Sequence, residues 1–386
     1  MMIDRSGLDD YPLYKDIHNM AEIAVGDLGP WISFVAGLEE RSKTISATFD
    51  RDESCGSKWI FRGQEDSAWP ITSTFEREYL EWYSQFRDPE RLLKEHELSM
   101  LERFRQKACG YVPRPEMSKV EWLALMRHYG VPTRFVDFTE SPFVALYFAS
   151  QVEDGCKEKS FSIWAVVRDN YNNYYAEKKD KEGRIFLDRV IRRYPKDQLN
   201  RVINDENSTD EDVLAYHRCT DPTAPNSLNL SQVMTANREG AELVLSGDVA
   251  ESGSVRSKIL TVYPQLPNSR MRAQSGLFLM PTQLSKPFME SLYEWSQLPK
   301  GKSAHKLAIE ECVDKDMAFA LSTQCNILKF VFPASLRKEV CAVLGMANVN
   351  AHTISPDLEG VADYVKKEFI CKDRIVYRDT IKISIS

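Results

Sequence analysis

The stretch LMRHYGVPTRFVDFTESPFVALYFA, Leu125 to Ala149, contains the end of one helix, a short strand and the beginning of a second helix. Gly130 suits the position just after a helix, because glycine adopts the left-handed conformation without strain. Ser141 can cap the next helix, and Pro142 suits its first turn. The stretch therefore predicts a loop and short strand between two helices, the second running from Ser141 to Val152 and mostly buried.

The helix before Gly130 also carries a start signal. Ser118 precedes the segment KVEWLALMRHYG, and Glu121 follows three residues later, in the capping-box arrangement. In that arrangement each side chain accepts a hydrogen bond from the backbone N–H of the other residue. The segment is therefore predicted to be a helix that ends at Gly130.

Further out, apolar runs predict the strands of one sheet. Four of them, SKWIFRG, FSIWAVV, SGLFLMP and NILKFVFP, contain Trp59, Ile163, Leu277 and Phe330, and SKILTVYP is a fifth. The pattern predicts helices at Pro89 to Cys109 and in the segments ASLRKEVCAVLGMAN and PDLEGVADYVKKEF, and an edge or hairpin strand in the tail DRIVYRDTIKISIS. The alternation of buried runs with capped helices predicts an α+β fold, in which helices flank a mixed central sheet.

Changes in the pattern divide the chain into four segments. Helix-like spacing from Tyr11 to Ser42, interrupted at Gly29 and Pro30, predicts two N-terminal helices that pack on the core within residues 1–57. Residues 58–168 and 258–386 are interpreted as the two halves of one domain, and residues 169–257 as a helical insertion subdomain. Within the insertion, the stretch RIFLDRVIRRYPKDQLNRVI is predicted to be helical.

The composition is that of an ordinary globular chain, with 386 residues, 43% hydrophobic, 28% charged and a net charge of −7. The mild acidity disfavours a protein that mainly coats nucleic acid, since that role needs a basic face. No apolar run approaches about eighteen residues and no leader pattern follows Met1, so we expect no membrane segment and a cytoplasmic location. The eight cysteines form no CxxC pair, so we expect reduced thiols and no metal site.

Four segments, in this order, resemble the FRG domain family, which is named for an aromatic-Arg-Gly motif. They are WIFRGQEDSAWPITSTFER, LMRHYGVPTRFVDFTESPFVALYFA, RAQSGLFLMP and the region from ILKFVFP to DYVKKEF. The resemblance covers most of the chain outside the N-terminal helices and the insertion. Some members look like parts of bacterial toxin or antiphage systems, so the resemblance implies a toxin or antiviral defence effector. An antitoxin or other regulatory partner is a further expectation.

A remoter resemblance, to ADP-ribosyltransferases, implies a reaction. These enzymes begin their NAD site with a strand ending in Arg-Gly or His-Gly, continue with a polar strand running into a helix rich in Ala, Leu and Phe, and finish with a Glu-bearing strand. Here WIFRG, DFTESPFVALYFA and RAQSGLFLMP fall in that order. The resemblance implies an ADP-ribosyltransferase-like core, NAD as the substrate, and a protein or nucleic acid as the acceptor. The position expected to be acidic is Gln274 or Gly276, so Asp137 is the expected substitute.

This resemblance assigns roles to individual residues. Loss of nicotinamide leaves an oxocarbenium-like ribose, so the site must bind a pyrophosphate, hold the carboxamide and stabilise positive charge. Arg62 is expected to bind the pyrophosphate and the Gly63 backbone to hold the carboxamide. The expected catalytic residues are Arg62, His128, Asp137 and Gln274, and the expected NAD contacts are Arg62, Gly63, Gln64, Tyr129, Arg134 and Thr139. We expect Arg62, His128, Arg134, Asp137 and Gln274 to converge on one cleft, because each falls at a predicted strand or helix end.

Structural roles are open for the same residues. Arginine is the usual choice for buried ion pairs, so Arg62 is alternatively a partner of Asp137 or Glu65, and Arg134 a partner of Asp137. A histidine at a helix end is also stabilised by the helix dipole. A different class of function, a nucleic-acid-binding or nucleic-acid-processing module, would place phosphates on the insertion residues Arg189, Arg192, Arg193, Lys196 and Arg201. A non-enzymatic interaction scaffold is the third alternative.

Overall fold

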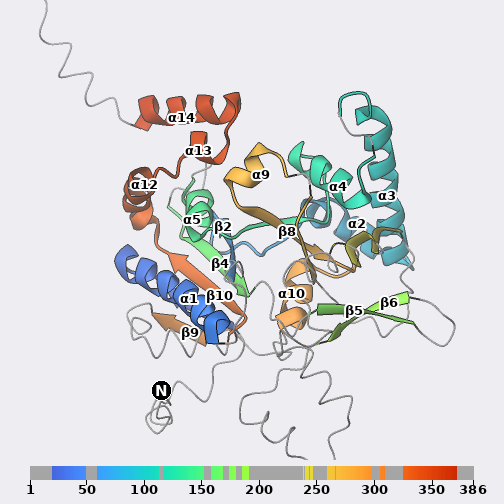
Figure 1. The fold of residues 1–386 in the computed structure, drawn as a ribbon, viewed down its shortest axis with the longest axis horizontal. Helices are drawn as coiled ribbons and strands as arrows, with labels where there is room; N and C mark the ends of the chain where they lie inside the picture. The colour runs from blue at the N-terminus through green and yellow to red at the C-terminus, as the bar shows by residue number, and fades with distance from the viewer. Residues whose placement is uncertain are drawn as a thin grey trace, which may run out of the picture.

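The structure is a computed structural model (Figure 1), and its described residues include most of the predicted strands and helices. The described residues are 20–48, 59–112, 116–151, 158–167, 174–179, 185–190, 238, 240–242, 244–246, 259–265, 267–296, 305–308 and 325–371. The predicted strand in the tail after Lys372 lies outside these residues. Within them, no helix combines the length and the hydropathy needed to span a bilayer.

An eight-stranded mixed sheet forms the centre of the molecule. Its strands lie in the order β7, β8, β3, β2, β4, β10, β1, β9. The strands β1 and β10, and β1 and β9, are parallel, and the other neighbours are antiparallel. The bounds are β1 Met20–Ala24, β2 Trp59–Gln64, β3 Val136–Thr139, β4 Phe161–Val167, β7 Ile259–Val262, β8 Gly276–Pro281, β9 His305–Ala308 and β10 Ile327–Phe332. The mixed central sheet is therefore confirmed, and it contains the predicted strands β2, β4, β7, β8 and β10 and the predicted short strand β3.

Helices cover the sheet (Figure 1), and the longer ones mostly lie where the sequence predicts. The predicted helices are α3 (Pro89–Ala108), α4 (Lys119–His128), α5 (Pro142–Ser150), α12 (Arg337–Met346) and α14 (Leu358–Cys371). The unpredicted ones are short or flank loops: a π-helix η2 (Glu76–Leu80), α2 (Glu81–Ser84), α9 (Ser269–Ala273), α10 (Phe288–Ser296), a 3-10 turn η4 (Ala334–Leu336) and α13 (Ala351–Ile354).

Both faces of the central strands are covered, which explains their continuous apolar sequence. In β4, Phe161 and Ile163 join a core cluster with residues of α1 (Leu28–Thr48), α5 and α12. Trp164 and Val166 join a second cluster with α10. At the far end of the sheet, Phe278 of β8 packs with residues of α4. Every residue of β4 is buried, as is usual for strands covered on both faces.

The local signals around Leu125 to Ala149 act as predicted, with one exception. Ser118 Oγ accepts the N–H of Glu121 at 3.3 Å, and Gly130 has the left-handed φ of 77°. Ser141 Oγ likewise accepts the N–H of Val144 at 3.3 Å. The Glu121 side chain does not complete a capping box, because its carboxylate accepts the N–H of Gln265 at 3.0 Å instead.

The first N-terminal helix is a wrong prediction over its described part. Met20–Ala24 forms β1, which lies between β10 and β9. A single helix α1, Leu28–Thr48, follows and contains Gly29 and Pro30 in its first turn. The apolar spacing fits a helix, but β1 gains backbone partners on both edges from segments about 300 residues away, and those partners decide its conformation.

The insertion also departs from the helical prediction. Tyr174–Lys179 (β5) and Ile185–Val190 (β6) form an antiparallel pair, so the stretch predicted as a helix begins as a strand. Ile, Phe, Leu and Val favour a strand once a neighbouring segment supplies the hydrogen bonds. Residues 238, 240–242 and 244–246 are helical. Of the basic residues considered for nucleic-acid binding, Arg189 belongs to β6, and Arg192, Arg193, Lys196 and Arg201 lie outside the described residues.

Candidate functional site

Two central strands separate where the site is predicted. β2 and β3 pair at one position, Phe61 with Thr139, whereas β2 pairs with β4 along its whole length. Beyond Phe61 the backbones of β2 and β3 no longer pair. A side-chain bond joins the strands there instead, since Arg62 Nη1 donates to the carbonyl oxygen of Asp137 at 2.7 Å. A pocket of about 990 Å³ opens here, lined by α4 on one side and α5 on the other. This volume lies at the upper end of the range of about 300–1,000 Å³ that is typical of small-molecule sites.

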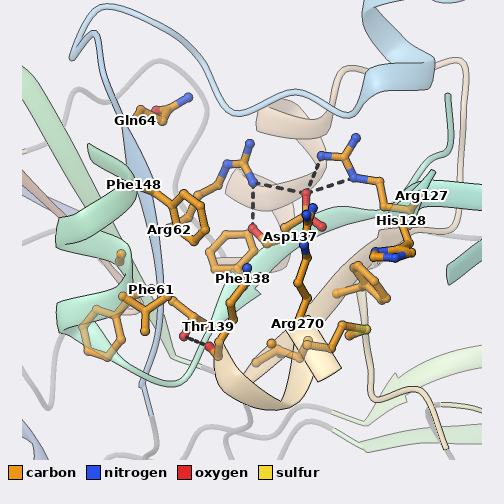
Figure 2. Close-up of a pocket in the computed structure, with 18 of the residues that line it drawn as sticks. Phe61, Arg62, Gln64, Arg127, His128, Asp137, Phe138, Thr139, Phe148 and Arg270 are labelled. Carbon is orange, nitrogen blue, oxygen red and sulfur yellow. Dashed lines mark hydrogen bonds and ion pairs between the residues drawn. The ribbon is translucent and has the colours of Figure 1, made fainter. Parts of the chain in front are cut away.

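Asp137 lies at the centre of the pocket's charges, between two arginines (Figure 2). Arg127 donates to Asp137 Oδ2 through Nε at 3.0 Å and through a second, shorter bond from Nη2. Arg62 Nη1 lies 3.9 Å from the same oxygen. Burial raises the pKa of the carboxyl, but the charge and hydrogen bonds of Arg127 and the charge of Arg62 outweigh it and hold the pKa below its ordinary value. Asp137 is therefore an anion at neutral pH, and its side chain is 45% exposed.

Arg62 pairs with Asp137, but its side chain is not fully buried. Its side chain is 20% exposed, and its Nε is buried without a hydrogen-bond partner. Burial lowers the pKa of Arg62 to about 10, with the charges of Arg127 and Arg77 acting in the same direction and that of Asp137 opposing them. The group stays positive at neutral pH. The contact with Asp137 matches the structural alternative, and the 20% exposure leaves part of the side chain accessible to a ligand.

Gly63 and Gln64 line the pocket, but the described contacts give them packing roles. A Cβ on Gly63 would lie 2.0 Å from the carbonyl oxygen of Ala145 and 2.6 Å from the backbone N of Ala149. Glycine is thus needed for α5 to lie on β2. The Gln64 amide donates to Pro70 O at 3.1 Å and accepts from Trp164 Nε1 at 2.6 Å. Both ends of its side chain are therefore occupied.

His128 and Gln274 reach the pocket from α4 and from the end of α9. Burial and the charge of Arg270 lower the pKa of His128, although Asp357 and Glu359 oppose this, so the imidazole is neutral at pH 7. Gln274 Nε2 donates to Ile354 O at 3.3 Å.

Thr139 ties β3 to the turn after α9. Its Oγ1 donates to Gln274 O at 2.6 Å and accepts the N–H of Ser141 at 2.9 Å. The next residue in that turn, Ser275, has a φ of 47°, which is rare for a residue with a side chain. These bonds fix the position of the turn after α9 relative to β3, where both line the pocket.

Two predicted contacts are not brought into the pocket. Arg134 is 1% exposed and forms an ion pair with Glu97, which is also 1% exposed. Its Nε lies 3.0 and 2.8 Å from the two carboxylate oxygens, so it pairs with Glu97 and not with Asp137. Tyr129 is largely exposed beside His128 and does not line the pocket. The expected convergence therefore holds for Arg62, His128, Asp137 and Gln274 but is wrong for Arg134.

Several lining residues were not predicted, and one of them had a sequence signal. Arg127 lies with Ala124 and His128 on one face of α4, at the i, i+3, i+4 spacing of helix neighbours. Arg77, Arg270 and Phe148 were also not predicted, and they reach the pocket from η2, α9 and α5.

The pocket carries more positive than negative side chains. Among the described lining residues, the cations are Arg62, Arg77, Arg127 and Arg270, and the carboxylates are Glu65 and Asp137. Within the part of the chain that the structure describes, no group of three or more His, Cys, Asp or Glu side chains is placed to hold a metal ion. The arrangement therefore favours an anionic ligand.

Comparison with protein families gives one match. Residues 57–158 match the family model described as the FRG domain. The match spans β2, α3, α4, β3 and α5, and so includes Arg62, Arg77, Arg127 and Asp137. No curated protein and no solved structure matches the chain.

Proposed function

We propose that the pocket between α4 and α5 binds NAD and that the chain transfers ADP-ribose from NAD to a macromolecular acceptor. The observation that carries the proposal is the meeting of Arg62 with an exposed, ionised Asp137 in one large, positively charged pocket. The segments that build it, β2, β3 with α5, and β8, follow one another as the corresponding segments do in the ADP-ribosyltransferases that the sequence resembles.

Arg62 is the proposed anion contact. It is charged at neutral pH, its side chain is 20% exposed, and it lies at the point where β2 leaves β3. A guanidinium offers a planar set of donors that matches phosphate oxygens better than an ammonium does.

Asp137 is the proposed group that stabilises positive charge. Departure of nicotinamide leaves cationic character on the ribose, and a fixed carboxylate nearby lowers the energy of that state. Among the described residues both arginine contacts fall on Oδ2, and the Asp137 side chain is 45% exposed, so part of the carboxylate stays accessible to a ligand. The low pKa keeps this group charged. It thereby takes the place of the glutamate that the sequence lacks at Gln274 or Gly276.

Two aromatic residues supply surfaces for the flat rings of the ligand. Trp69 and Phe148 line the pocket and are 44% and 40% exposed. Exposed aromatic faces inside a polar pocket commonly stack on nucleotide bases. An acceptor macromolecule, an effector role in toxin or antiphage defence and a cytoplasmic location are the further parts of this proposal.

The test combines NAD binding with NAD turnover. We expect NAD to raise the melting temperature of the wild type by mass action. Arg62→Ala and Arg62→Lys should fold, and both should lose NAD consumption, whereas Arg91→Ala, a matched change on the exposed face of α3, should keep it. Asp137→Asn should still bind NAD but lose at least about 100-fold in turnover, in the range typical of a lost electrostatic contact.

Each outcome separates the alternatives. A collapsed melting temperature in Arg62→Ala would give Arg62 a structural role only. Stabilisation of the wild type by oligonucleotides and not by NAD would favour the nucleic-acid alternative. Wild-type turnover in a folded Asp137→Asn variant would exclude this carboxylate from the reaction.

A further inference from the structure

Arg77 is a second arginine of the pocket, and among the described residues its guanidinium forms no ion pair. It is exposed, lines the pocket, and donates from Nη1 to Thr72 Oγ1 at 3.0 Å and to Thr72 O at 3.4 Å. Among the described residues, no carboxylate lies within ion-pair distance of it. Thr72 orients the guanidinium without neutralising it, so donors and a full charge remain for a ligand.

The segment that carries Arg77 is firmly anchored. Arg77 is the second residue of the π-helix η2, a conformation that is rare and frequent at functional sites. Ser73 Oγ accepts the N–H of Glu76 at 3.0 Å, and the Glu76 carboxylate accepts the N–H of Phe288 at 3.1 Å. Phe75, just before η2, is 1% exposed. The guanidinium therefore extends from a rigid base.

The other pocket arginines are more fully occupied. Arg127 is bound to Asp137 and to Thr74 Oγ1 at 3.3 Å. Arg270 is paired with Asp357 at 2.9 Å and also with Glu359. Among the described residues, Arg62 meets a carboxylate only at 3.9 Å and Arg77 meets none. Positive charge therefore remains on both, and the charge of Arg77 disfavours the charged form of Arg62. A ligand with two neighbouring anionic groups would relieve that repulsion.

We infer that the ligand of this pocket carries two linked phosphoryl groups, one bound by Arg62 and the other by Arg77, so that Arg77 selects diphosphates over monophosphates. The inference rests on the proposed function in taking this pocket as the ligand site, but it does not depend on the transfer reaction. Two linked phosphoryl groups can place one anionic group at each guanidinium and so form a charge-assisted contact with both.

Isothermal titration with ADP-ribose and with AMP tests this inference at similar ligand charge. The diphosphate of ADP-ribose carries one negative charge on each phosphoryl group, and AMP carries about −1.5 to −2 on one. We expect the wild type to bind ADP-ribose at least about tenfold more tightly than AMP. Arg77→Ala should remove that preference by weakening ADP-ribose binding about tenfold, while AMP binding stays within about twofold. Arg91→Ala should change neither.

The controls keep the result decisive. Because Arg77 is exposed, Arg77→Ala and Arg77→Gln should melt at the wild-type temperature, and either folded variant suffices. Equal binding of ADP-ribose and AMP by the wild type, no ADP-ribose binding at all, or unchanged ADP-ribose binding in the Arg77 variants would each overturn the inference. ADP-ribose binding that depends on Arg77, without any NAD turnover, would support the inference and refute the transfer reaction alone.

Discussion

The contact between β2 and α5 at Gly63 predicts a large loss of stability from one methyl group. In Gly63→Ala the new Cβ would lie 2.0 Å from Ala145 O and 2.6 Å from Ala149 N. Non-bonded carbon contacts are comfortable at roughly 3.5 Å, so strand and helix would have to separate by about 1 Å or more. Both clashing atoms belong to the backbone, so no side-chain rotation can relieve the overlap.

The cost follows from the packing of α5. Ala145, Leu146 and Ala149 are fully buried, so a displaced α5 would lose close contacts with the core. Overpacking typically costs about 1–3 kcal/mol, and we expect the upper end, about 3 kcal/mol of unfolding free energy, because the helix must move as a unit. Urea unfolding followed by circular dichroism measures this loss.

Gly276→Ala is the matched control in the same pocket. The nearest atom to its new Cβ would be Met271 O at 3.4 Å, an ordinary contact, so the unfolding free energy should change by less than about 1 kcal/mol. A Gly63→Ala variant as stable as the wild type would refute the close approach of β2 and α5, and would return Gly63 to the role of a ligand contact.

Other parts of the structure make three further predictions. Arg134→Met should cost about 3–5 kcal/mol by leaving Glu97 buried without its partner, and adding Glu97→Leu should recover part of that loss in urea unfolding; equal stabilities would contradict the buried pair. Asp137→Asn should lower the free energy of unfolding at pH 7. Because the folded pKa of Asp137 is depressed, the difference in unfolding free energy between variant and wild type should shrink as pH falls below the ordinary pKa of about 3.9. A difference that grew would refute the ion pair with Arg127. Arg270→Ala should cost less than about 1 kcal/mol, because its pairs are partly exposed, yet speed hydrogen exchange in α13 and α14; unchanged exchange would show that Arg270 does not hold them.

Elements with local signals were predictable from the sequence. The helices α4 and α5 begin at Ser118 and Ser141 because a hydroxyl three residues before a backbone N–H can cap it wherever the chain lies. Gly130 ends α4 for an equally local reason, since its φ of 77° suits glycine. β4 is recognisable because burial on both faces demands an unbroken apolar run.

Elements without local signals depended on pairing with another segment of the chain. Met20–Ala24 has helix-like spacing but is a strand, because β10 and β9 pair with it from more than 280 residues away. Ile185–Val190 likewise pairs with Tyr174–Lys179 instead of extending a helix. A strand's stability comes from hydrogen bonds to another segment, and a single-segment pattern contains no information about that segment.

The candidate site divides in the same way. The sequence by itself indicated Arg62, His128, Asp137 and Gln274, because each lies at the end of an element, where polar side chains are expected to meet. Only the tertiary structure decided which charges pair. Asp137 forms its ion pair with Arg127 and not with Arg134, and Arg134 forms a buried ion pair with Glu97. It alone also brought Arg77 to the pocket. Ion pairing depends on distances of a few ångströms and on burial between segments far apart in the chain, and both quantities exist only once the chain has folded.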